Sequence, residues 1–117
     1  MQFVVDVDER EGSVVVRVGG EVDLGSAPRL RDAAVARLMD GDRNLVLDLS
    51  AVEFIDSVGL GTLVAILKRA RSLGGDVSLV VTSDRVRRPL ELTGLDAVFT
   101  IHDQLAAALS AGRTPAP

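Results

Sequence analysis

From residue 44 onward, strand-like and helix-like segments alternate regularly along the chain. Residues 44–49 (NLVLDL) form a nearly continuous apolar run, which is typical of a strand buried on both faces of a sheet. Apolar residues then recur at helical spacing over about 58–73, and residues 76–81 (DVSLVV) again resemble a strand. Strands that alternate with helices pair in parallel through right-handed crossovers, so this half of the chain predicts an α/β fold with a central strand at 44–49.

The remaining C-terminal segments continue this alternation in shorter pieces. Residues 83–93 predict a short helix, which Pro89 should shorten or kink because proline lacks an amide N–H and clashes with the preceding turn. Residues 97–101 predict a fifth strand, and Asp103 should cap a last helix that carries Leu105 and Leu109. Residues 112–117 form a polar tail with two prolines, which we expect to be frayed and flexible.

The N-terminal part begins differently, with two β-branched runs joined by a short link. Residues 3–8 and 13–18 are separated by a Gly-containing connection, which predicts an antiparallel hairpin. The chain should leave the second strand at Gly19 and enter a helix over about 27–40, capped by Ser26 or Asp23. The sequence thus predicts a mixed sheet of about five strands, antiparallel at first and then largely parallel, with about four helices.

Composition excludes several classes of function. The chain has 117 residues, the usual size of one domain, and it contains no cysteine, which excludes disulfides, thiolate zinc sites and thiol nucleophiles. A net charge of −4 and the lack of Trp and Tyr argue against nucleic acid as a partner. No apolar stretch is long enough to cross a membrane and no signal peptide is evident, so we expect a cytoplasmic protein.

Residues capable of catalysis are scarce. The single histidine, His102, has no nucleophile or second metal ligand near it in sequence, so we assign it no role and expect a solvated loop position. Five aspartates at predicted strand ends could gather around magnesium, but solvated turn and cap positions are the simpler interpretation. Gly59 and Gly61 lack the third glycine of a dinucleotide fingerprint. We therefore predict a protein that is not an enzyme and has no cofactor or metal.

The segment Asp56-Ser57-Val58-Gly59-Leu60-Gly61 is the most informative one in the chain. Ser57 directly precedes an apolar helix and so predicts an N-cap. Each glycine in the first turn of a helix costs about 1 kcal/mol relative to alanine, which suggests that these positions are kept small for the close approach of a partner rather than for folding. A serine hydroxyl at the positive end of a helix dipole would also hold a phosphate well.

Four segments together resemble a known family, over about residues 3–110. They are Gly20-Glu21-Val22-Asp23, Leu47-Asp48-Leu49-Ser50, Phe54 to Gly61 and Leu92-Thr93-Gly94-Leu95, and they look like the anti-sigma factor antagonists built on the STAS domain. The resemblance implies a single STAS-like domain over residues 1–111. It also implies a bacterial regulator of transcription that acts by partner switching.

The resemblance implies a function for the informative segment. In this family the serine, Ser57 here, is phosphorylated by a Ser/Thr kinase that also acts as the anti-sigma factor, and a phosphatase is expected to reverse the reaction. The unphosphorylated protein binds the kinase and releases a sigma factor. The implied partner-binding residues are Asp23, Asp56, Ser57, Val58, Gly59, Leu60 and Gly61.

The chain departs from the family pattern at one position, and the resemblance also leaves one alternative function open. Some members carry a second hydroxyl residue after the first, but Val58 stands there, so Ser57 is the only acceptor that this segment offers. The rival is a STAS-like scaffold or regulatory component of a stress-signalling or transport assembly. Both functions are binding roles without cofactors, nucleic acid or membrane.

Overall fold

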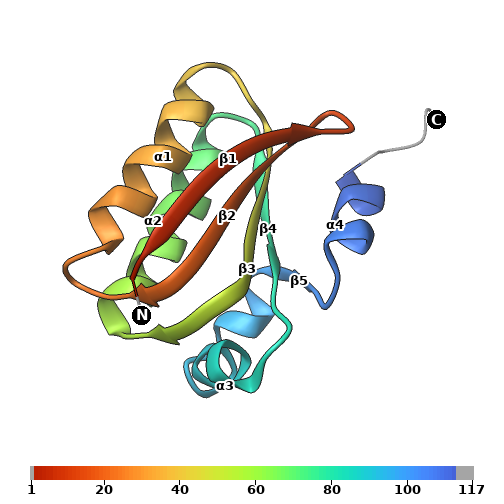
Figure 1. The fold of residues 1–117 in the computed structure, drawn as a ribbon. Helices are drawn as coiled ribbons and strands as arrows, with labels where there is room; N and C mark the ends of the chain where they lie inside the picture. Colours follow the sequence, from red (N-terminus) through yellow and green to blue (C-terminus); the bar gives the residue numbers. More distant parts are fainter. Residues whose placement is uncertain (1, 113–117) are drawn as a thin grey trace.

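A computed structural model describes residues 2–112 of the chain (Figure 1). The strands are β1 (Val4–Arg10), β2 (Ser13–Val22), β3 (Asn44–Ile55), β4 (Asp76–Val80) and β5 (Thr100–His102). The helices are α1 (Ala27–Met39), α2 (Ser57–Ser72), α3 (Asp84–Leu92) and α4 (Leu105–Gly112), with a short 3-10 helix, η1, at Leu95–Ala97. In the predicted tail, residues 112–117, Gly112 is the last residue of α4 and the rest lies outside the described residues.

The five strands form one mixed sheet, as the sequence predicted. Their spatial order is β1-β2-β3-β4-β5, so β3 is the central strand. β1 and β2 form an antiparallel hairpin in which Arg10 pairs with Ser13, and all later pairings are parallel. Because β2, β3 and β4 run in the same direction, the loops that follow them all leave from one edge of the sheet.

The main hydrophobic core lies between the sheet and the helices α1 and α2, which cover the same face (Figure 1). Alternate residues of β2 and β3 face this core because side chains of a strand point to opposite sides in turn. The core members from these two strands include Val14, Val16, Val18, Leu45, Leu47 and Leu49. α4 lies on the opposite face, where Ala108 and Leu109 pack on Val15, Val46 and Val80.

Two strands extend beyond their predicted ends. We expected the chain to leave β2 at Gly19, but the strand continues to Val22, and β3 continues past Leu49 to Ile55. The pairing of β2 with β3 shifts register on either side of Gly19 and Gly20. Gly20 has a φ of +82°, and a Cβ there would lie 2.3 Å from the carbonyl oxygen of Gln2. The two glycines therefore bend the strand without ending it, which is a common property of β-bulges.

The C-terminal elements also differ from the prediction in detail. The fifth strand covers only Thr100–His102, because residues Leu95–Ala97 form the 3-10 helix. Pro89 lies inside α3, which is nine residues long and within the predicted range. α4 begins at Leu105, two residues after Asp103. The types and order of the elements were thus predicted correctly, and their bounds were less accurate.

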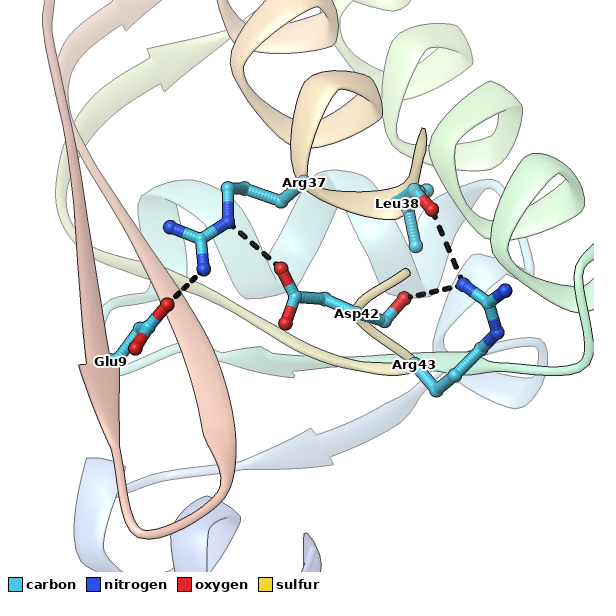
Figure 2. Close-up of polar contacts among 5 residues, drawn as sticks. All are labelled: Glu9, Arg37, Leu38, Asp42 and Arg43. Carbon is cyan, nitrogen blue, oxygen red and sulfur yellow. Dashed lines mark hydrogen bonds and ion pairs between the residues drawn. The ribbon is translucent and has the colours of Figure 1, made fainter. Parts of the chain in front are cut away.

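The edge of the sheet where β2 and β3 begin is held together by a charged network (Figure 2). The Arg37 guanidinium donates from Nε to Asp42 Oδ2 at 2.8 Å and also binds the Glu9 carboxylate in the hairpin. The Arg43 guanidinium donates to the backbone carbonyls of Leu38 and Asp42, at 3.2 and 3.0 Å. The network therefore connects the hairpin, the C-terminus of α1 and the start of β3.

Candidate functional site

The N-terminus of α2 follows directly after β3, at the opposite edge of the sheet from the charged network. Its N-cap is Asp56, whose Oδ1 accepts a hydrogen bond from the Gly59 amide at 2.8 Å. The predicted cap was Ser57, and that assignment is wrong, because Ser57 is the first residue of the helix itself. An aspartate and a serine are equally good caps, so their order along the chain could not decide between them.

Ser57 is exposed at the first position of this sixteen-residue helix. Its hydroxyl makes no hydrogen bond within the described part of the chain. Since Asp56 already caps the helix, the Ser57 hydroxyl has no structural role there and is accessible to a modifying enzyme. The adjacent carboxylate of Asp56 gives the position a negative neighbour.

The loop between β2 and α1 is fixed by Asp23 and Ser26. Asp23 Oδ1 accepts hydrogen bonds from the amides of Gly25 and Ser26, at 3.0 and 3.1 Å. The Ser26 hydroxyl donates to the Glu21 carbonyl at 2.7 Å and accepts from the Asp23 amide at 3.0 Å. Ser26 is the N-cap by position, although its side chain caps no amide of α1. These bonds hold the loop in one conformation.

A backbone hydrogen bond connects this loop to the start of α2. The Asp56 amide donates to the Val22 carbonyl at 3.1 Å, and Val22 pairs with Ile55 in the parallel ladder. Asp23 follows Val22 and Ser57 follows Asp56, so both lie one residue beyond this bond. The structure therefore brings together the two segments that the family resemblance implies lie at one edge.

The two glycines of the segment have different surroundings. A Cβ on Gly59 would lie 2.7 Å from both Ile55 Cγ1 and the Val22 carbonyl oxygen, whereas a Cβ on Gly61 would have nothing within 4 Å. The interpretation of Gly59 as a residue kept small for a partner is therefore wrong, because close helix–sheet packing requires it. Gly59 and Leu60 are buried, while Val58 and Gly61 are exposed beside Ser57.

Large apolar side chains are exposed around this edge. Leu24 in the β2–α1 loop is 72% exposed, Phe54 near the end of β3 is 50% exposed, and Val58 is 41% exposed. We refer to these three residues as the apolar rim. Sequence reasoning did not select Leu24 or Phe54 as site residues, although a leucine between Asp23 and Gly25 in a polar loop was an available signal.

The other candidate groups do not form a catalytic site. His102, predicted to be a solvated loop residue, is instead the last residue of β5 and is half-buried. Asp48 is buried, and its carboxylate accepts hydrogen bonds from the Ser50 amide and hydroxyl. Residues 2–112 contain no cluster of three or more His, Cys, Asp or Glu side chains that could hold a metal ion. None of the helices among these residues is long and apolar enough to span a membrane.

Comparison with known proteins identifies the fold and the family. The sequence pattern of the STAS domain matches residues 4–108, which is most of the chain and includes both segments of the site. The chain belongs to the STAS domain family. The mixed sheet with its antiparallel start is accordingly the STAS fold, as the sequence resemblance implied.

Several STAS relatives are regulators of sigma factors by name. The chain is 40% identical over 107 residues to the anti-sigma-F factor antagonist RsfB of Mycobacterium tuberculosis, covering 86% of this chain and 85% of RsfB. It is 36% identical over 101 residues to the anti-sigma-B factor antagonist of Bacillus subtilis, covering 86% of this chain and 92% of that protein.

Solved structures support the same grouping. An anti-sigma factor antagonist from Mycobacterium paratuberculosis superposes with a TM-score of 0.89 at 40% identity, covering 97% of this chain and 96% of that one. The unphosphorylated form of the anti-sigma factor antagonist SpoIIAA has the same fold, with a TM-score of 0.74 at 22% identity over 97% of this chain and all of SpoIIAA.

Proposed function

We propose that this STAS protein is an anti-sigma factor antagonist that is switched by phosphorylation of Ser57. In its unphosphorylated form it binds an anti-sigma factor Ser/Thr kinase, and this binding releases a sigma factor. The observation that carries the proposal is the exposed Ser57 hydroxyl at a helix N-terminus, at the same edge of the sheet as three exposed apolar side chains. The names of the relatives at 36–40% identity support the same role.

The apolar rim gives the docking surface its affinity. Leu24, Phe54 and Val58 come from three separate elements at one edge of the sheet, and their exposure costs free energy that a partner recovers by covering them. Aromatic and large aliphatic side chains near the centre of an interface commonly contribute most of the binding energy. Asp23 and Asp56 would then lie close to this surface and influence which partner charges are accepted.

Phosphorylation changes the charge at the centre of this surface. A phosphate on Ser57 adds about −1.5 to −2 charges beside the carboxylate of Asp56. The positive end of the α2 dipole stabilises a phosphate, so the domain should stay folded. Burying this charge against the kinase is costly, and a change from 99% bound to 1% bound requires about 5.5 kcal/mol of binding free energy.

The chemistry of phosphate transfer must come from partners. A kinase needs a base and a set of groups that bind the phosphates and their metal ions, and residues 2–112 contain no cluster of three or more His, Cys, Asp or Glu side chains that could hold such an ion. In this proposal a separate kinase supplies the phosphate, and a separate phosphatase restores the binding form. We expect these encounters to take place in the cytoplasm, where ATP is available.

The direct test is phosphorylation by the cognate kinase followed by mass spectrometry. We expect one phosphate on the wild-type protein and on Thr62→Ala, and none on Ser57→Ala. Thr62 is a suitable control because its hydroxyl lies one turn further along α2 and donates to the Val58 carbonyl. Normal labelling of Ser57→Ala would exclude Ser57 as the acceptor.

A second test separates charge from the loss of the hydroxyl. Ser57→Ala should bind the unmodified kinase as tightly as wild type in calorimetry, because the hydroxyl makes no bond in the domain. Ser57→Asp should bind far more weakly while unfolding at the same temperature or a higher one, since an acidic residue in the first turn favours the helix dipole. Equal affinities of the two variants would refute the electrostatic switch.

A further inference from the structure

A cavity lies beside α4, on the face of the sheet opposite α1 and α2. In Figure 1, α4 is separated by the sheet from α1 and α2. The cavity has a volume of about 160 Å³, and its floor includes Ser13, Asn44, Ser78 and Thr100, with Ala108 and Ala111 of α4 forming a wall. It starts at the first residues of β2 and β3, whereas Ser57 follows the other end of β3. It is therefore separate from the proposed docking surface.

Two buried polar atoms at this cavity have no hydrogen-bond partner within residues 2–112. They are the hydroxyl oxygen of Ser13, a residue only 3% exposed, and Nε2 of His102. Both residues line the cavity. Buried polar groups are nearly always hydrogen-bonded, because leaving one unpaired costs free energy. A polar molecule held between α4 and the sheet could supply partners to these two atoms, which lie on β2 and β5.

The lining specifies the chemistry of that occupant. The hydroxyls of Ser13, Ser78 and Thr100 and the amide of Asn44 can each donate or accept a hydrogen bond. Among the described lining residues, Asp76 is the only carboxylate, and the Arg71 guanidinium and the Val77 amide already bind it. The described lining includes no lysine or arginine and offers many partners for hydroxyl groups.

The shape of the cavity limits the size of the ligand. Ser13, Asn44, Ser78 and Thr100 belong to four neighbouring strands, so the polar groups are distributed along a groove rather than around one point. A cavity of about 150 Å³ accepts a molecule with six non-hydrogen atoms, and a half-open groove of similar volume accepts slightly more. We propose that this groove binds a short linear polyol, an uncharged molecule with several hydroxyl groups and about six to ten non-hydrogen atoms.

The test is a titration of the full chain with erythritol, followed through backbone amide NMR signals. We expect saturable shifts at Ser13, Ser78 and Thr100 with a dissociation constant of about 1–10 mM, the range open to a ligand of eight non-hydrogen atoms. Butane-1,4-diol, which has the same carbon chain and two fewer hydroxyls, should bind at least about threefold more weakly. Inorganic phosphate should leave these signals unchanged.

Two variants and one control determine whether the groove is the site. Ser13→Ala should weaken erythritol binding at least about threefold without lowering the melting temperature, because the hydroxyl has no partner in the domain. Ala111→Leu should abolish binding by filling the groove, and Ser110→Ala, an exposed change on the same helix, should have no effect. The proposal is overturned if no saturable shift occurs up to about 100 mM erythritol, if butane-1,4-diol binds equally well, or if Ala111→Leu still binds.

Discussion

The two edges of the parallel strands treat their polar groups in opposite ways. Where β2 and β3 begin, Arg37 forms ion pairs with both Glu9 and Asp42, and Arg43 binds backbone carbonyls (Figure 2). Where these strands end, the Ser57 hydroxyl has no partner among the described residues and the apolar rim is exposed. The charged side chains of the first edge are thus bound within the chain, whereas the second edge presents a free hydroxyl and apolar side chains. This contrast supports the proposal that a protein partner binds at the Ser57 edge.

The charged edge shows how local contacts favour the charged form of a side chain. The hydrogen bonds that Arg37 donates to Asp42 first, and then to Glu9, raise the pKa of Arg37 above its ordinary value. At the opposite edge, the carboxylates of Asp23 and Asp56 accept hydrogen bonds from backbone amides at the start of a loop and of a helix.

The largest effect should come from polar substitution of the apolar rim. The double variant Leu24→Ser/Phe54→Ser should lose about 3 kcal/mol or more of binding free energy to the anti-sigma kinase, which is over about 100-fold in affinity. Its free energy of unfolding should fall by only about 1 kcal/mol, because Leu24 is largely exposed and Phe54 is half-exposed in the free protein. Calorimetric binding and denaturant unfolding of the same samples measure both quantities.

A matched control for the rim exists elsewhere on the surface. Leu92, at the end of α3, is 78% exposed and lies outside the two segments of the site. Leu92→Ser should leave kinase binding unchanged. If Leu92→Ser weakened binding as much as the double variant, the docking surface would not be confined to the edge that carries Ser57.

The next largest effect separates the two glycines of α2. Gly59→Ala should lower the free energy of unfolding by about 2 kcal/mol, because its Cβ would overlap Ile55 and the Val22 carbonyl. Gly61→Ala should raise it by up to about 1 kcal/mol through helix propensity, since its Cβ meets nothing. Urea unfolding of both variants measures these changes. Equal changes in the free energy of unfolding would show that Gly59 is not closely packed in solution.

A smaller effect is expected from the helix cap. Asp56→Ala should destabilise the protein by about 1 kcal/mol, because the Gly59 amide loses its acceptor. Asp56→Asn keeps an acceptor while removing the charge, so it should retain most of the stability. A thermal melt of the two variants tests the cap, and similar losses in both would mean that the charge, rather than the hydrogen bond, is what matters.

The smallest effect should occur at the charged edge. Arg37→Met keeps much of the side-chain volume and removes both ion pairs, which should lower the melting temperature slightly at low salt and less at high salt. Kinase binding should be unchanged, because Arg37 lies at the opposite edge from Ser57. A loss of binding in this variant would contradict the division of the molecule into a structural and a functional edge.

The sequence predicted the order of elements well because their periodicities are strong. The apolar run at 44–49 and the helical spacing after Ser57 left little choice of element type, and the structure confirmed both. The strand ends were missed, because Gly19 and Gly20 were interpreted as a break. A glycine can end a strand or form a β-bulge within it. Which of the two occurs depends on the segment packed against it, here Gln2, which lies far from Gly20 in the sequence.

Prediction of the site was likewise limited by contacts between segments that are distant in the sequence. The family resemblance implied that Asp23 shares an edge with Asp56 and Ser57, and the structure joins the two segments through the bond from the Asp56 amide to the Val22 carbonyl. Their role in binding a partner stays a prediction. The difference between Gly59 and Gly61 could not be predicted, because it depends on which glycine faces Ile55 across the helix–sheet contact. The exposure of Phe54 could not be predicted either. The side chains of β3 alternate between the two faces of the sheet, and this pattern can be extended to Phe54 only when the strand is known to continue to Ile55.

The half-exposed ring of Phe54 also has an optical consequence. The chain contains three Phe and neither Trp nor Tyr, so the native protein is almost silent in fluorescence excited near the tryptophan band. Phe54→Trp would keep an aromatic ring in the rim and make it the only strong fluorophore in the molecule. Its emission would shift to shorter wavelength as water leaves the ring, so every encounter with a partner at this edge could be followed in real time without a label.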